Sequence, residues 1–202
     1  LVFAALREKS LAPAQPVRVS ERAWRAPGSR MFIAPRSQVT VADLLRGMIV
    51  QSGNDACVAL AEAVAGSEEA FGQRMNREAA RLGMRDTHFA NSSGLPGPEH
   101  YSTAADLGLL TTSLIRDFPE HYRLYAEREY RYNNITQQNR NRLLWLDPHV
   151  DGVKTGHTES AGYCRVTSAL RDGTRLISVV MGTASDSART EAVGRAPGPS
   201  VY

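Results

Sequence analysis

Apolar residues recur at helical spacing through the middle of the chain. From Val41 to Val50 they occupy positions i, i+3, i+4, i+7 and i+8, which predicts a helix with one buried face. Thr40 and Asp43 form a capping box at its start. Residues 55–66 are rich in alanine and end at a glycine, so they predict a second helix that follows almost at once.

Further segments continue the helical pattern. Residues 67–83 begin with an N-cap serine, carry two glutamates in the first turn and stop at a glycine. Residues 102–118 predict another capped helix, which ends before Pro119. The chain opens on residues 1–10, whose pattern is that of the last turns of a helix.

Strand patterns lie on both sides of this helical region. Short extended pieces are expected around Val17 and Val19, and a short apolar strand at residues 31–33. Residues 127–135 alternate charged and aromatic side chains, which predicts one half-exposed strand. Residues 162–183 form two strand-like runs joined by Asp-Gly, a strong hairpin signal. Helices followed by an antiparallel sheet favour an α+β fold, with a helical lobe beside the sheet.

Composition narrows the class of protein. The 202 residues are 42% hydrophobic and 22% charged, with a net charge of +3, which suits one sizeable domain. The positive residues are dispersed, so no nucleic-acid partner is expected, and no apolar run is long enough to span a bilayer. Five histidines lack metal-ligand spacing, so neither a metal nor a cofactor is expected. Cys57 and Cys164 are expected to be buried free thiols, with a single disulfide as the lesser alternative.

Two short motifs carry the candidate chemistry. Ser52-Gly53-Asn54 lies in the tight link between two predicted helices, and Lys154-Thr155-Gly156 lies at the mouth of the closing sheet. The 24 lysines and arginines include only two lysines, one of them Lys154. A compact amine can adjust its pKa, whereas a guanidinium stays charged. The first triplet alone is better explained as a helix-capping loop, but the two in this order are typical of penicillin-binding proteins and class A β-lactamases.

Longer stretches make the likeness more specific. The chain resembles the D-alanyl-D-alanine carboxypeptidases, which are low-molecular-mass penicillin-binding proteins of the β-lactamase/transpeptidase-like fold. The resemblance covers residues 1–193, which we expect to be one partial domain, followed by an irregular tail at 194–202. It is carried by LLRGMIVQSGNDACVALAEAVAGS, RLGMRDTHFANSSGL, QNRNRLLW and VDGVKTGHTESAGYC.

The resemblance implies acyl transfer from a peptidoglycan stem peptide ending in D-Ala-D-Ala to a serine and then to water, and binding of β-lactam antibiotics. Ser52 would relay a proton to the leaving amine, and Asn54 would hold the substrate backbone. Lys154 would pass or steer a proton.

The resemblance also implies a set of substrate-binding residues. The hydroxyl of Thr155 would lie beside the substrate carboxylate, and Gly156 would let the strand approach the peptide closely. The backbone N–H of His157 would complete an oxyanion hole. Arg189 would receive the terminal carboxylate. Arg140 would line the site, although a surface or structural ion pair is an equally good interpretation.

The sequence contains no S-x-x-K motif, because Lys9 follows Leu6 and Lys154 follows Asp151 at the spacing that the motif requires. The resemblance implies that the chain is a fragment, with this motif half a dozen residues before Leu1. The first strands of the sheet would be missing, and also the C-terminal helix that covers it, a trailing β-domain and an amphipathic membrane anchor. We expect the 202-residue chain alone to be inactive and not to be labelled by a β-lactam.

Other functions stay open at this point. The lack of S-x-x-K favours a non-catalytic module of the same fold that binds peptidoglycan. A β-lactamase or esterase of the same superfamily is disfavoured by His157 and by the AGYC and NRNRLLW stretches. The substrate places the parent protein in the periplasm or at the outer face of the cytoplasmic membrane.

Overall fold

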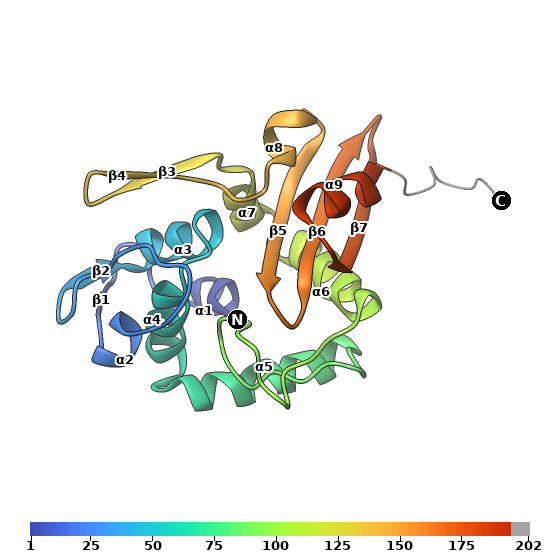
Figure 1. Ribbon diagram of the computed structural model, residues 1–202. Helices are drawn as coiled ribbons and strands as arrows, with labels where there is room; N and C mark the ends of the chain where they lie inside the picture. Colours follow the sequence, from blue (N-terminus) through green and yellow to red (C-terminus); the bar gives the residue numbers. More distant parts are fainter. Residues whose placement is uncertain (195–202) are drawn as a thin grey trace.

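The computed structural model describes residues 1–194, in which helices and a three-stranded sheet form two neighbouring halves (Figure 1). The helices are α1 (Val2–Arg7), α2 (Glu21–Trp24), α3 (Val41–Val50), α4 (Asn54–Ala65), α5 (Glu68–Leu82), α6 (Ala104–Asp117), α7 (Pro119–Tyr122), the 3₁₀ helix η1 (Arg123–Ala126), α8 (Leu143–Leu146) and α9 (Asp186–Gly194). The strands are β1 (Pro16–Arg18), β2 (Gln38–Thr40), β3 (Glu129–Tyr132), β4 (Ile135–Gln138), β5 (Val150–Thr158), β6 (Gly162–Arg171) and β7 (Thr174–Thr183). The prediction of an α+β fold is confirmed.

The long helices begin and end where the sequence places their caps. The Thr40 hydroxyl accepts a hydrogen bond from the backbone N–H of Asp43 at the start of α3, at 3.1 Å. Ser67 caps α5 in the same way. The helices α4 and α5 end at Gly66 and Gly83, whose φ values of 83° and 80° are left-handed, a conformation that glycine adopts without strain. The opening helix is shorter than predicted and ends at Arg7, not at residue 10.

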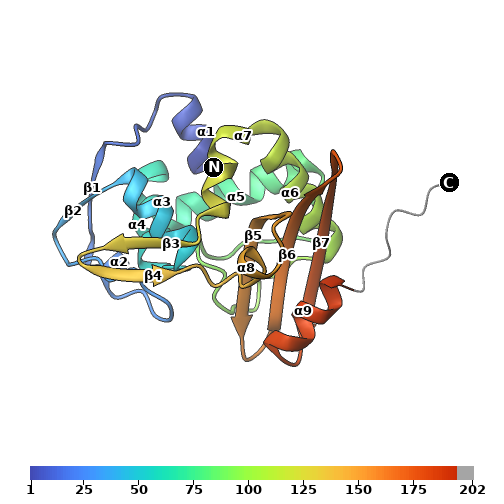
Figure 2. The ribbon, with the colours of Figure 1, turned by 90° about the horizontal axis from the view of Figure 1, so that it is seen from above.

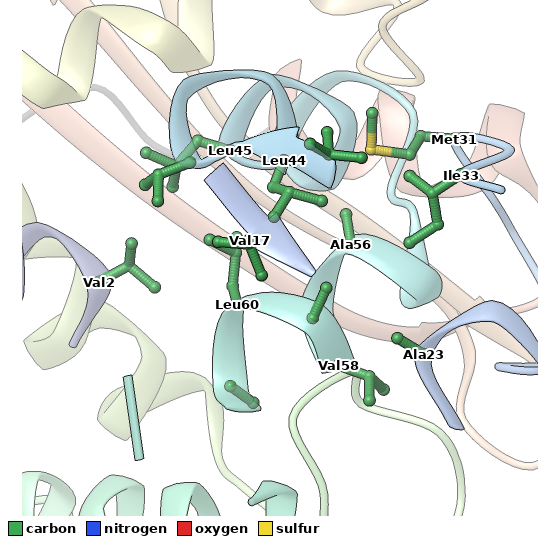
Figure 3. Packing of buried hydrophobic residues seen from close by; sticks show 14 of the residues in the cluster. Val2, Val17, Ala23, Met31, Ile33, Leu44, Leu45, Ala56, Val58 and Leu60 are labelled. Atoms are coloured by element: carbon green, nitrogen blue, oxygen red, sulfur yellow. The ribbon is translucent and has the colours of Figure 1, made fainter. Parts of the chain in front are cut away.

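The core of the helical half lies between α3, α4 and β1 (Figure 3). Leu44 and Leu45 of α3 pack in one cluster with Ala56 and Leu60 of α4 and with Val17 of β1. Burial of each large aliphatic side chain contributes roughly 1.5–3 kcal/mol, so this cluster fixes how the two helices lie. It therefore also holds the short loop that joins α3 to α4.

The predicted strand at residues 31–33 is wrong. The fully buried carboxylate of Asp55 accepts hydrogen bonds from the backbone N–H groups of Met31, Phe32 and Ile33, at 2.9, 3.0 and 3.3 Å. These donors are therefore not available for a β-ladder. The strand in this region is β2 instead, which pairs with β1.

The prediction of one strand at residues 127–135 is also wrong. The segment turns at Asn133 and Asn134, whose φ values are 47° and 61°, and returns as β4. Two consecutive residues with positive φ are typical of the tight turn in a β-hairpin. The β3–β4 hairpin is a separate two-stranded sheet that extends from the helical side (Figures 1 and 2).

The closing sheet has the order β5-β6-β7 with antiparallel pairing throughout. The predicted turn between β6 and β7 is confirmed: Asp172 and Gly173 have φ values of 47° and 77°. Helix α6 lies on one face of the sheet and α9 on the other (Figures 1 and 2). This arrangement leaves β5, the edge strand that carries Lys154-Thr155-Gly156, on the side of the helical half (Figure 1).

Helix α9 corrects two expectations from the sequence. We placed no helix at Asp186–Gly194, and we expected the helix that covers the sheet to be missing, but α9 contacts both β6 and β7. The predicted domain boundary after residue 193 is not tested. Gly194, the first residue of the predicted irregular tail, is the last residue of α9, and residues 195–202 lie outside the described part of the chain. Among residues 1–194, no helix combines the length and apolar character that crossing a membrane requires.

Candidate active site

A wide groove separates β5 from the loop between α3 and α4, and it has a volume of about 1710 Å³. All eight residues that the sequence analysis singled out line this groove: Ser52, Asn54, Arg140, Lys154, Thr155, Gly156, His157 and Arg189. The two motifs, far apart in the sequence, therefore meet in one site.

Lys154 and Ser52 are in direct contact across the groove. The Lys154 Nζ donates a hydrogen bond of 2.7 Å to the Ser52 Oγ and a second of 2.9 Å to the carbonyl oxygen of Thr155. Ser52 has a φ of 62°, which is unusual for a residue with a side chain and costs about 1–3 kcal/mol. The structure thus holds the serine hydroxyl in a strained loop at hydrogen-bonding distance from an amine.

The surroundings of Lys154 favour its neutral form. Burial is the main cause that lowers the pKa of the amine from 10.5 to about 8, and the nearby positive charges of Arg140 and Arg189 contribute to the same shift. An amine with such a pKa exists in both protonation states near neutral pH, so it can accept and return a proton. A guanidinium in the same place would stay charged.

Asn54 is held at the start of α4 by its own hydrogen bonds. Its Nδ2 donates to the carbonyl oxygen of Pro27 at 2.7 Å, and its backbone N–H donates to the carbonyl oxygen of Ser29 at 2.8 Å. Within the described residues no donor reaches its Oδ1. The amide oxygen is therefore the part of Asn54 that a ligand could use.

Arg189 is buried and links α9 to the sheet. Its Nη1 donates to the carbonyl oxygens of Gly156 and Cys164, at 3.1 and 3.0 Å, and its Nε donates to Asp186 Oδ1 at 2.6 Å. The guanidinium carbon lies 5.4 Å from the centre of the Tyr163 ring. Of its nitrogens, only Nη2 makes no hydrogen bond within residues 1–194. Its predicted role as a carboxylate receptor stays a prediction.

Three other predicted residues follow one another along the rim of the groove on β5. Thr155 is buried, whereas Gly156 and His157 are exposed. The imidazole of His157 lies over the ring of Tyr163, with 3.9 Å between ring centres. A Cβ on Gly156 would touch only the Cβ of Cys164, at 4.0 Å, so the rim is open there for an extended ligand.

Arg140 stabilises the loop that carries Ser52. Its Nε donates to the carbonyl oxygen of Gln51 at 3.0 Å, and it forms no ion pair within the described residues. Within residues 1–194, no acidic partner supports the alternative interpretation of Arg140 as half of an ion pair. Arg140 thus lines the groove next to Ser52, because it is bonded to the preceding residue, Gln51.

The sequence analysis missed Cys57 and Tyr125 as groove residues. Cys57 and Cys164 are free thiols, as predicted, and the alternative of a disulfide between them is wrong; both side chains are only partly buried. Burial raises the pKa of Cys57 to about 12, which keeps its thiol protonated. Cys57 lies three residues after Asn54, almost one helical turn along α4, and this spacing was the available signal.

Metal ligands do not gather in this groove. Within the described part of the chain, no group of three or more His, Cys, Asp or Glu side chains is placed to hold a metal ion. The polar groups that the two motifs and the two arginines bring to the groove are hydroxyls, an amine, an amide and guanidinium groups. These groups can donate and accept hydrogen bonds, and the amine can also exchange a proton.

Comparison with known proteins agrees with this geometry. A family model described as D-alanyl-D-alanine carboxypeptidase matches residues 1–185. The chain is similar to D-alanyl-D-alanine carboxypeptidase DacC of Escherichia coli, with 47% identity over 94% of this chain and 49% of the relative. The structure is similar to penicillin binding protein 5 from Haemophilus influenzae, with a TM-score of 0.92, 42% identity and coverage of 96% of this chain and 58% of that one.

A second similar structure contains a ligand. It is Penicillin-Binding Protein D2 from Listeria monocytogenes in the ampicillin-bound form, with a TM-score of 0.85, 29% identity and coverage of 96% of this chain and 79% of that one. The chain spans about half the length of the curated relatives that it matches. The family model and the relatives match most of the chain, and the two triplets meet in one groove. The chain therefore belongs to the D-alanyl-D-alanine carboxypeptidase family of low-molecular-mass penicillin-binding proteins.

Proposed function

We propose that the protein to which this chain belongs is a serine-type carboxypeptidase, which releases the terminal D-alanine from peptidoglycan stem pentapeptides through an acyl-enzyme. The observation that carries the proposal is the 2.7 Å contact between Lys154 Nζ and Ser52 Oγ inside a groove. A hydroxyl bonded to an amine of lowered pKa is suited to deliver a proton to a leaving amine.

In this mechanism the serine of an S-x-x-K motif attacks the carbonyl carbon of the penultimate D-alanine and gives up its hydroxyl proton to neutral Lys154. As the C–N bond breaks, Ser52 passes a proton to the departing nitrogen and takes its replacement from Lys154 through the existing hydrogen bond. Water then attacks the acyl carbon and gives a proton to the same pair, which protonates the motif serine as its ester bond breaks. The 202-residue sequence contains no S-x-x-K, so we expect this chain alone to release no D-alanine.

The groove also supports a way of holding the substrate. The free Nη2 of Arg189 and the hydroxyl of Thr155 would receive the terminal carboxylate, and Asn54 Oδ1 would accept from a substrate N–H. The backbone N–H of His157 would bind the developing oxyanion. β-Lactams would bind in the same groove, as the ampicillin-bound Listeria relative suggests.

The proposal includes a location and partners. Peptidoglycan lies outside the cytoplasmic membrane, so the protein would act in the periplasm or at the outer face of that membrane. Association with the membrane through a C-terminal anchor, as the resemblance implies, is part of the same proposal.

The test uses a longer form of the protein that includes an upstream S-x-x-K. It should release D-alanine from a stem pentapeptide and form a β-lactam adduct on the motif serine. Lys154→Arg should reduce release by about 100-fold, because the guanidinium keeps its proton. Lys9→Arg is the matched control, since Lys9 is the other lysine of the chain and is exposed.

A different result would favour the alternative function. If the folded longer protein binds stem peptide but releases no D-alanine, it is a non-catalytic peptidoglycan-binding module. If Lys154→Arg and Lys9→Arg are equally active, Lys154 has no part in proton transfer.

A further inference from the structure

We propose that Ser52 and Lys154 form a nucleophile–base pair in their own right, which small activated esters of aliphatic acids acylate at Ser52. This activity is distinct from D-alanine release, where Ser52 only relays a proton. It requires nothing beyond the described residues, so it does not rest on the proposed function.

The pair has the geometry of an activated nucleophile. Such a site needs a hydroxyl within hydrogen-bonding distance of a base and a third group that orients the base. Ser52 Oγ lies 2.7 Å from Lys154 Nζ, and the carbonyl oxygen of Thr155 lies 2.9 Å from the same nitrogen. The position of the Lys154 amine is therefore fixed by two hydrogen bonds, one to Ser52 and one to Thr155.

The backbone at Ser52 adds to this arrangement. Its φ of 62° places the serine at a sharp turn between α3 and α4, with a hydroxyl that faces the groove. Strained backbone conformations that the surroundings maintain occur preferentially at functional sites, and nucleophilic serines occur at such sharp turns in other folds. The turn is held by the hydrogen bond of Gly53 N–H to the carbonyl oxygen of Gly47, at 3.0 Å.

The base is able to take the proton of the serine. Burial lowers the pKa of Lys154 to about 8, so a substantial fraction is neutral in mildly alkaline solution. The thiol of Cys57 is close enough to interact electrostatically with the same amine, and burial raises its own pKa to about 12, so it stays neutral and does not compete as a thiolate. Arg140 and Arg189 are the charged groups whose positive charge acts on Lys154.

Arg140 is placed to stabilise the anion that forms. Its Nε is bonded to the carbonyl oxygen of Gln51, next to Ser52, and its two terminal nitrogens make no hydrogen bond within residues 1–194. An unpaired guanidinium beside the nucleophile can bind the oxyanion of a tetrahedral intermediate. In the reaction with an ester, the Arg140 guanidinium would bind the oxyanion in place of backbone N–H groups, which the reaction of an amide would require.

The apolar part of the groove lining indicates the class of substrate. Aliphatic side chains line it at half burial, and they suit a short alkyl chain better than a polar peptide. These side chains are Met48, Leu107, Leu110 and Leu114. Esters with a good leaving group react without full oxyanion stabilisation, whereas the amide of D-Ala-D-Ala does not, so that amide is outside this activity.

The reaction balances with the groups present. The neutral Lys154 amine takes the proton from Ser52 Oγ as the oxygen forms a bond to the ester carbonyl carbon. With a p-nitrophenyl ester as substrate, the bond between the carbonyl carbon and the phenol oxygen then breaks, and p-nitrophenolate leaves with the electron pair. Lys154 is left as an ammonium, which releases its proton to solvent, and water later hydrolyses the acyl-serine.

The experiment uses the 202-residue chain and p-nitrophenyl butyrate. We expect release of p-nitrophenolate about 100-fold above the rate for Ser52→Ala, and a butyryl group on Ser52 in mass spectra of the digested protein. Lys154→Arg should be as slow as Ser52→Ala. Ser37→Ala should react like the unmodified chain, since Ser37 does not line the groove and its hydroxyl donates to the carbonyl oxygen of Ala34, not to an amine.

A labelling experiment on the unmodified chain tests the same proposal without relying on the correct folding of any variant. A small alkyl fluorophosphonate should label Ser52 and block the release of p-nitrophenolate. Labelling of another residue, or equal rates for the chain and Ser52→Ala with both folded by circular dichroism, would overturn the proposal. D-alanine release by the longer protein depends on S-x-x-K, so the two proposals can fail separately.

Discussion

The Nζ of Lys154 lies 2.7 Å from the Oγ of Ser52, although the two residues are 102 positions apart in the chain. One belongs to a strand of the closing sheet and the other to a loop between two buried helices. The contact therefore depends on how the two halves of the molecule pack, and it is sensitive to changes in either half. Four predictions test this dependence.

Lys154 should titrate with a midpoint near pH 8 instead of 10.5, because burial disfavours its ammonium. The chain has two lysines, so ¹³C-labelled lysine gives two side-chain signals by NMR, and Lys9→Arg assigns them. Between about pH 8 and 10.5 the unfolded chain binds more protons at this group, so its contribution makes folding stability rise with pH. A midpoint above 10 would show that the amine is hydrated.

Gly53→Ala should displace Ser52 and Asn54 and abolish the reactivity of the groove. A Cβ at this position would lie 2.9 Å from Asp55 Oδ1 and 3.0 Å from the backbone nitrogen of Met31, neither of which can move freely. Gly108→Ala is the control, because nothing lies within 4 Å of its added Cβ in α6, and it should stabilise the chain by roughly 0.5–1 kcal/mol. Ester turnover and urea unfolding separate the two effects; an active Gly53→Ala variant would show that the loop can relax.

Asp55→Ala should destabilise the chain by about 3 kcal/mol or more, because several backbone N–H groups lose a buried acceptor together. Asp86→Ala serves as the control, since Asp86 is exposed and its carboxylate makes no hydrogen bond or ion pair within the described residues, and it should change stability by less than about 0.5 kcal/mol. The measurement is the urea midpoint of both variants. A loss below about 1 kcal/mol for Asp55→Ala would mean that water replaces the carboxylate.

Arg189→Lys in the longer protein should raise KM for stem pentapeptide by roughly 10–100-fold, with a smaller effect on kcat. An ammonium cannot reach the carbonyl oxygens of Gly156 and Cys164 and a substrate carboxylate together, and each charged hydrogen bond contributes roughly 1.5–3 kcal/mol. Steady-state release of D-alanine gives both constants. Arg85→Lys, at an exposed arginine, should leave both unchanged, and an unaltered KM for Arg189→Lys would remove Arg189 from substrate binding.

The sequence predicted the long helices well because their caps and periodicity are local signals. Val41–Val50 was predicted to the residue, with Thr40 as its cap. The residues of the groove were also predicted, although by motif and resemblance and not by any local pattern. The structure brings the residues of both motifs together in one groove.

Two of the errors arose where contacts that the local sequence does not reveal determined the backbone, and one arose where a local signal was given too little weight. Residues 31–33 look like a strand, but the carboxylate of Asp55, more than twenty residues away, binds their N–H groups. Asn133 and Asn134 were a local signal for a hairpin, and the alternation of aromatic residues around them was given more weight. Helix α9 is short and mostly polar, and it is positioned by Arg189 and Asp186 through contacts that its sequence does not reveal.

The hydrogen bonds from Arg189 to Gly156 and Cys164 have a practical consequence. They brace one wall of the groove with a helix at the end of the described chain, while the main apolar core lies in the other half. A cut within α9 would therefore remove the support of the strand that bears Lys154 without touching the main core of the helical half.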